Sequence, residues 1–131
     1  MLLIDKVLID KVSKAASESP RLRMNYNFHG SPESKSQRLL NALEPGTIMS
    51  VHRHNDTSET YVLLRGKLRV MYYNSKKELT ESAVLGSSTG NYGVNIPAGQ
   101  WHSLEVLEHG TVIFEAKDGP YVPLSGENVL G

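Results

Sequence analysis

The chain of 131 residues contains no cysteine. This excludes disulfides, thiolate metal sites, cysteine-bound iron–sulfur clusters and cysteine nucleophiles together. No apolar run reaches the roughly 18 residues that a membrane-spanning helix needs, so we expect no membrane partner. The first residues lack a basic region and are interrupted by Asp5 and Asp10, so we expect no secretory signal and a cytoplasmic location.

The chain also has no excess of charge of either sign. Lys and Arg number 14, as do Asp and Glu, and the formal net charge is zero. Nucleic-acid surfaces depend on clustered Lys and Arg, so we expect no nucleic-acid partner. Hydrophobic residues make up 39% and charged residues 21%, which is typical of a folded protein, and the length predicts a single domain over residues 1–131.

Residues 1–20 are predicted to form an N-terminal α-helix. Asp5 can cap its first turn, and the Ser17–Pro20 cluster can end it because proline disfavours helical backbone at the preceding residue. Apolar residues recur at helical spacing and are expected to face the core. This stripe consists of Ile4, Val7, Leu8, Val12 and Ala15.

Short β-strands are predicted for residues 38–117. Segments rich in Val, Ile, Leu, Thr and Tyr alternate there with Gly, Pro, Asn, Asp and Ser clusters, which favours an antiparallel sandwich or a small barrel. The polar residues 21–37 are predicted to form a loop, and residues 118–131 an extended C-terminal tail. The predicted strands are 38–43, 47–54, 59–65, 67–73, 79–85, 93–96, 101–107 and 111–116.

Three of the five histidines occupy patterned positions. His52 and His54 are one residue apart in a predicted strand, so both imidazoles project from the same face. Glu59 follows a short turn, which brings it back beside the pair, and His102 lies in a later strand. Three imidazoles and one carboxylate that converge in a barrel mouth indicate a site for a divalent transition metal.

The spacing of these residues resembles the cupin superfamily. Its first motif is matched by Gly46, His52, His54, Glu59 and Gly66. The second is matched by Pro97, Gly99 and His102 but departs at its two ends, which are Asn91 and Val106 here. The resemblance implies a mainly β fold, the cupin double-stranded β-helix or jelly-roll barrel, with an N-terminal α-helix. It also implies that His52, His54, Glu59 and His102 bind the metal.

Further segments are similar to the WbuC-type cupin metalloproteins, and this likeness extends over nearly the whole chain. That family is associated with lipopolysaccharide O-antigen gene clusters, which implies a pathway neighbourhood rather than a reaction. The segments that carry the likeness are Arg21–Arg23, Asn25–His29, Gln37–Arg38, Asn41–Thr47 and Phe114–Tyr121.

Four protein ligands leave two positions on an octahedral ion and none on a tetrahedral one. The expected cofactor is one divalent transition metal, and Fe²⁺, Mn²⁺, Ni²⁺ and Zn²⁺ all stay open. Strand parity predicts that Tyr61 faces the site, where it either binds the substrate or supports the metal ligands; the alternative is a tyrosine that only packs in the barrel. The 21–38 segment is predicted either to fold over the mouth and contribute substrate-binding residues, or to be a solvated surface loop. The candidate substrate-binding residues of this segment are Arg38, Asn25, Asn27 and His29.

Three hypotheses for the function follow. The leading one is an enzyme that isomerises or epimerises a small oxygen-rich substrate, such as a sugar, by Lewis-acid chemistry. The second is an Fe²⁺ dioxygenase, and the third is a non-catalytic module that binds a carbohydrate-like ligand through the metal. The sequence identifies no catalytic residue. We also expect a homodimer, because the open sheet edges can pair two chains.

Overall fold

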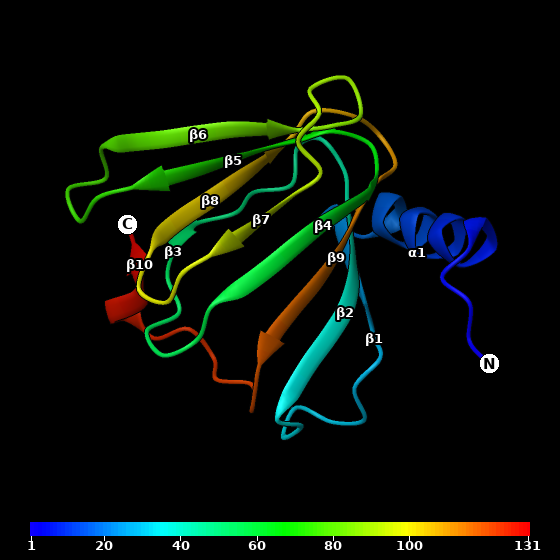
Figure 1. Ribbon diagram of the computed structural model, residues 1–131, viewed down its shortest axis with the longest axis horizontal. Coiled ribbons are helices and arrows are strands. Elements are labelled where there is room, and N and C mark those ends of the chain that lie inside the picture. The colour runs from blue at the N-terminus through cyan, green and yellow to red at the C-terminus, as the bar shows by residue number, and fades with distance from the viewer.

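Two antiparallel five-stranded sheets face each other in the computed structural model, which describes residues 1–131 (Figure 1). In chain order the strands switch repeatedly between the sheets, as in a jelly roll. The first sheet has the order β1 (Arg23–Asn27), β2 (Ser36–Leu43), β9 (Thr111–Asp118), β4 (Glu59–Arg65) and β7 (Gly93–Ile96). The second has the order β10 (Val129–Leu130), β3 (Val51–His52), β8 (Trp101–Val106), β5 (Leu68–Tyr73) and β6 (Leu79–Leu85).

Helix α1 (Lys6–Glu18) confirms the predicted N-terminal helix, and it is too short to cross a membrane. The Asp5 side chain accepts a hydrogen bond from the Leu8 amide at 3.0 Å, which caps the first turn. The helix ends before Ser19, whose extended backbone suits the residue that precedes a proline.

The buried face of α1 differs from the predicted stripe. Leu8, Val12 and Ala16 are buried, whereas Ile4 and Val7 are 46% and 76% exposed. The buried residues recur every fourth position and pack on Leu40, Ala42 and Val112 on the outer face of the first sheet. The ion pair between Asp10 and Arg65 also holds the helix to β4.

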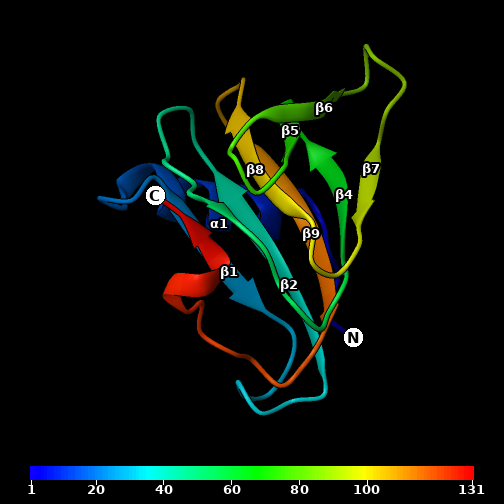
Figure 2. The same cartoon turned by 90° about the vertical axis from the view of Figure 1, so that its left-hand side faces the viewer.

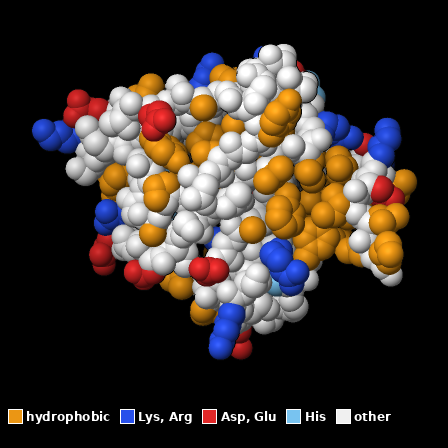
Figure 3. All heavy atoms as spheres, viewed as in Figure 1, with side chains coloured by type: hydrophobic (Ala, Val, Ile, Leu, Met, Phe, Trp, Pro, Cys, Tyr) orange, Lys and Arg blue, Asp and Glu red, His pale blue; other side chains and the backbone are white.

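Apolar side chains remain exposed beside the helix. Figure 3 shows hydrophobic side chains gathered on the face over β4 and β9, next to α1. Val62 and Leu64 of β4 are about 40% exposed there. This surface lies on the outside of the first sheet, away from the space between the sheets.

The interior between the sheets is aliphatic over most of its length. Its buried cluster takes residues from both sheets: Leu43, Tyr61, Leu68, Val70, Leu85, Ile96, Leu104, Val106 and Ile113. Burial of this apolar surface holds the two sheets together, since the inner face of each sheet is shielded from water by the other sheet. The packing therefore sets the distance between side chains that the two sheets carry.

Three predicted segments need correction. Residues 21–37 are not all loop, because residues 23–27 form the edge strand β1, which pairs with β2. The predicted strand 47–54 shrinks to Val51–His52. The tail does not stay extended: it turns back through a short 3-10 helix (Gly126–Asn128) and β10 pairs with β3, as Figure 2 shows. All three depend on pairing with distant residues, which local composition does not encode.

The turn between β4 and β5 is tightly packed at Gly66, and substitution of this glycine measures how much that packing matters. A Cβ at Gly66 would lie 2.6 Å from the Thr111 Cα, and its φ is +93°. Gly66→Ala should therefore lower the free energy of unfolding, measured by urea titration, by more than about 2 kcal/mol.

Gly90 is the matched control for this substitution. Its φ is +74°, but nothing lies within 4 Å of a Cβ built there. Gly90→Ala should cost only the left-handed backbone conformation, about 1–2 kcal/mol. Equal losses for the two variants would show that the contact with Thr111 contributes nothing.

Candidate metal centre

The strand register brings the histidines together. His52 in β3 pairs directly with His102 in β8, and residues opposite each other in an antiparallel pair project to the same face. Their ring centroids are 4.3 Å apart. His54 follows two residues after His52 and returns to the same side, with its ring centroid 5.3 Å from that of His52.

A backbone contact joins the two sequence motifs. The Gly99 amide donates a hydrogen bond to the His54 carbonyl at 2.7 Å. Gly99 has a φ of +80°, a left-handed conformation that glycine adopts without strain. The turn before β8 is thereby held against the end of the His52–His54 segment.

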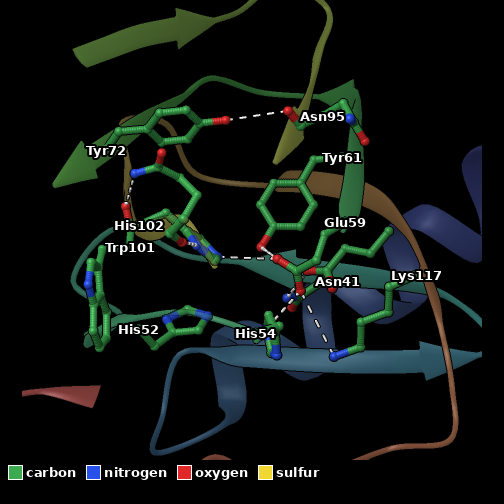
Figure 4. A network of polar contacts seen from close by, with 12 residues as sticks. Asn41, His52, His54, Glu59, Tyr61, Tyr72, Asn95, Trp101, His102 and Lys117 are labelled. Atoms are coloured by element: carbon green, nitrogen blue, oxygen red, sulfur yellow. Dashed lines mark hydrogen bonds and ion pairs between the residues drawn. The ribbon is translucent and has the colours of Figure 1, made fainter. Parts of the chain in front are cut away.

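Glu59 reaches the histidines from the opposite sheet. It is the first residue of β4, and its side chain is 5% exposed. Its Oε1 lies 3.0 Å from His54 Nε2 and its Oε2 lies 3.2 Å from His102 Nε2 (Figure 4). One donor atom from each of the three histidines also lies within 4.8 Å of the others. The structure thus brings all four predicted residues to one point.

Backbone carbonyls orient two of the imidazoles. His52 Nδ1 lies 2.8 Å from the Ser50 carbonyl and His102 Nδ1 lies 2.9 Å from the Gln100 carbonyl. A carbonyl only accepts, so each Nδ1 carries a proton, and in the neutral ring each Nε2 then keeps its lone pair. Metal-binding histidines are oriented in this manner, with one nitrogen donating to the protein and the other free for the ion.

The arrangement of His102 and Glu59 is suited to binding a cation between them. His102 Nε2 is buried and has no hydrogen-bond partner, although the Glu59 carboxylate is 3.2 Å away. When the His102 ring is neutral, two lone-pair atoms face each other there, which is unfavourable in a buried place. A divalent cation between them removes the repulsion, so the residues present fit a transition metal.

Burial and charge also set the required protonation states. Burial, followed by the nearby His102, lowers the pKa of His52 to about 4, so its imidazole is neutral at neutral pH. Burial by itself raises the pKa of Glu59, but the hydrogen bonds and positive charge that His102 and His54 provide when protonated outweigh this and hold the pKa well below its usual range in the metal-free protein. Neutral imidazoles and an ionised carboxylate are the forms that bind metal.

Tyr61 lies where strand parity predicts it. Its hydroxyl donates a hydrogen bond to Glu59 Oε2 at 2.9 Å, and the residue is 4% exposed. Burial, with the charges of Glu115 and Glu59, raises its pKa well above the usual value. The phenol therefore stays protonated and orients the carboxylate.

A cleft of about 310 Å³ adjoins the centre through Lys117, which approaches Glu59, although none of the four predicted metal-binding residues lines the cleft itself. Asn25, Asn27 and His29 line it, on and just after the edge strand β1. Arg38 does not: Gln37 and Leu39 face the cleft, so Arg38 between them projects to the opposite, exposed face of β2. The backbone of Arg38, but not its side chain, contacts a residue that lines the cleft: its amide and carbonyl both lie 3.1 Å from His29 Nδ1.

Sequence reasoning missed two residues of β9 that line the same cleft. Glu115 accepts a hydrogen bond from the Asn41 side chain at 2.9 Å, and Lys117 Nζ lies 3.9 Å from Glu59 Oε1. Burial, followed by the charge of Glu59, raises the pKa of Glu115 to about 6. Their spacing by two along a strand was the available signal, but it needs the register of β9 against β2 and β4 to be read.

The two sheets have a cupin-like fold. The chain is similar to KdgF from Halomonas sp., with a TM-score of 0.60 at 13% identity over 77% of this chain and 81% of that one. A cupin-2 domain protein from Shewanella frigidimarina gives 0.52 at 18% identity over 70% and 76%. The capsular polysaccharide assembling protein CapF from Staphylococcus aureus gives 0.54 at 22% identity over 79% of this chain and only 29% of CapF. These likenesses confirm the jelly-roll cupin fold.

Residues 4–85 match the family described as Domain of unknown function (DUF6016), and the chain belongs to that family. No curated protein matches the chain at a significant level.

Glu115 gives the centre a measurable pH dependence in the metal-free protein. Its pKa is about 6 in the folded state against 4.5 ordinarily, so its ionisation costs stability as the pH rises from 4.5 through 6. Glu115→Gln keeps an oxygen to accept from Asn41. It should be more stable than the parent at pH 7.5 by at most about 2 kcal/mol, less any screening by solvent.

This gain should vanish at pH 4, where the parent carboxyl is protonated. Thermal unfolding in EDTA across this pH range measures both values, and Glu33→Gln, on the exposed loop before β2, controls for loss of one charge. A gain that stays the same at pH 4 would contradict the assignment to Glu115 ionisation.

Proposed function

We propose that the chain binds one divalent transition metal, Fe²⁺, Mn²⁺, Ni²⁺ or Zn²⁺, through His52, His54, Glu59 and His102. The observation that carries this is the buried His102 Nε2, which has a lone pair, no hydrogen-bond partner and a carboxylate oxygen at 3.2 Å. No other described residue offers that nitrogen a proton. The orientation of His52 and His102 by backbone carbonyls adds support.

We further propose that the protein is an enzyme that isomerises or epimerises a small oxygen-rich molecule. A bound divalent ion supplies Lewis-acid polarisation of a ligand oxygen. Tyr61 holds Glu59 in place, and the aliphatic interior beyond it limits water. Glu115 is the carboxyl best placed to accept a proton from the substrate, because it lines the cleft and has one oxygen held by Asn41.

A sugar or sugar derivative is the substrate class that we favour. The cleft lining is polar, with carboxamide, imidazole, carboxylate and ammonium groups that suit hydroxyl ligands. The likeness to WbuC-type cupins and to CapF, whose name describes capsular polysaccharide assembly, supports a role in polysaccharide biosynthesis. The predicted homodimer and cytoplasmic location remain predictions.

Metal binding can be measured directly. Trp101 is the only tryptophan and adjoins His102, so bound Ni²⁺ should quench its fluorescence. The parent protein should bind about one equivalent, and at 100-fold excess over Kd the metal should stabilise it by about 2.7 kcal/mol. His52→Ala and His102→Ala should each lose stoichiometric binding, because each removes a donor atom from the cluster.

His109→Ala is the matched control for these variants. Its side chain is 91% exposed and pairs with Glu44, outside the cluster. It should retain full metal content by elemental analysis, and circular dichroism should show that all three variants stay folded. Full metal content in His52→Ala and His102→Ala would contradict the ligand assignment.

Proton chemistry has its own test. The metal-loaded parent should exchange a substrate C–H with deuterated water in a panel of sugars, sugar acids, sugar phosphates and nucleotide sugars, followed by NMR. Glu115→Gln should slow the exchange about 100-fold or more while retaining the metal, since a general base contributes roughly that factor. Saturable binding without exchange across the panel would favour a binding module, and oxygen uptake by the Fe²⁺ form would favour a dioxygenase.

A further inference from the structure

Lys117 lines two neighbouring openings in the protein surface and lies beside Glu59 of the proposed metal centre. It lines the cleft over the inner face of β1, β2 and β9, and it also lines a groove that includes His54 and the turn after it. Its side chain is only 16% exposed. Figure 4 shows it extending toward Glu59 from the side opposite His102.

The ammonium of Lys117 lacks a close acceptor. It makes no hydrogen bond, and its one ion pair is the 3.9 Å approach to Glu59 Oε1, which is too long for a hydrogen bond. The ring of Tyr121 lies 5.9 Å away. Under the function proposed above, the charge of Glu59 also serves the metal. A largely buried cation without a hydrogen-bonded partner is costly, and an anionic group of a ligand would offset that cost.

Glu115 complements this cation on the same strand. Side chains two apart on a strand project to the same face, about 7 Å from each other, so both enter the cleft. Asn41 engages Oε1 of Glu115, and Oε2 is free to accept from a hydroxyl group. Asn25 and Asn27, on the facing edge, add carboxamides that can donate or accept.

The donors present favour a carboxylate over a phosphate. Phosphate sites usually combine several donors, such as an Arg fork or a helix N-terminus. Lys117 is the only Lys or Arg that lines the cleft. In the adjoining groove, the Arg53 Nε donates to the Asn128 side chain and its guanidinium lies over Trp101, so Arg53 is already engaged.

We propose that this cleft binds a polyhydroxylated carboxylic acid, such as a sugar acid. Lys117 pairs with the carboxylate, and Glu115 with Asn25 and Asn27 contacts the hydroxyl groups. The inference rests on the proposed function and narrows its substrate class from oxygen-rich molecules to monoanionic ones. Lys117 is thereby the residue that determines specificity.

The test compares three probes that share one ring on protein loaded with Mn²⁺: D-glucuronate, D-glucose and D-glucose 6-phosphate. Calorimetry should show glucuronate binding at least about tenfold more tightly than glucose, as one charge-assisted hydrogen bond predicts. Lys117→Met keeps the length of the side chain but removes its charge, and it should abolish that preference. Lys76→Met, in the exposed turn between β5 and β6, is the matched control and should keep it.

Metal content measured on the same samples separates the two proposals. Protein that holds one equivalent of Mn²⁺ yet binds glucose and glucuronate equally would overturn this inference alone, as would an unchanged preference in Lys117→Met. Tighter binding of glucose 6-phosphate than of glucuronate would overturn the choice of a carboxylate. Failure to load any metal would instead overturn the proposed function on which the inference rests.

Discussion

The site depends on a single carboxylate that reaches across the sandwich. Glu59 begins β4 in one sheet, and its two oxygens meet His102 of the other sheet and His54, which follows β3 of that sheet. No secondary-structure element holds both sides, so the spacing comes from the aliphatic core that joins the sheets. A cavity in that core would change the separation of ligand atoms as well as the stability. The packing of the core therefore also constrains the distances between the ligand atoms of the metal centre.

Strand β9 shows how alternation lets one segment serve two purposes. Val112 packs under α1 on the outer face, whereas Glu115 and Lys117 line the cleft on the inner one. The helix covers the outer face and leaves the inner face free for polar chemistry. The same strand therefore contributes both to the stability of the first sheet and to the composition of the cleft.

His52, His54 and Glu59 could be predicted from local rules, whereas His102 was added by its place in the second cupin motif and meets His52 through strand register. Alternation puts His52 and His54 on one side, and a short turn returns Glu59 to them. The cleft residues follow from register instead. Arg38 and Lys117 have the same charge and both lie in strands, yet only the pairing of β2 with β9 shows that Arg38 faces outward and Lys117 inward. The edge strand β1 escaped prediction for the same reason, since its partner is β2 and its own composition is polar.

The C-terminal strand β10 holds the segment that carries His52 in place, because it pairs with β3. Strand β3 spans two residues, too few to hold a ligand rigidly by itself. Val129 pairs with His52, and the Arg53 amide donates to the Asn128 carbonyl at 3.1 Å. The Arg53 guanidinium then lies over Trp101, which precedes His102. His52 and His102 are thus clamped on both sides by the chain, whereas His54, 17% exposed, lies beyond the last paired residue of β3. The histidine with the least support from strand pairing is therefore also the one that lines an opening, the groove that it shares with Lys117.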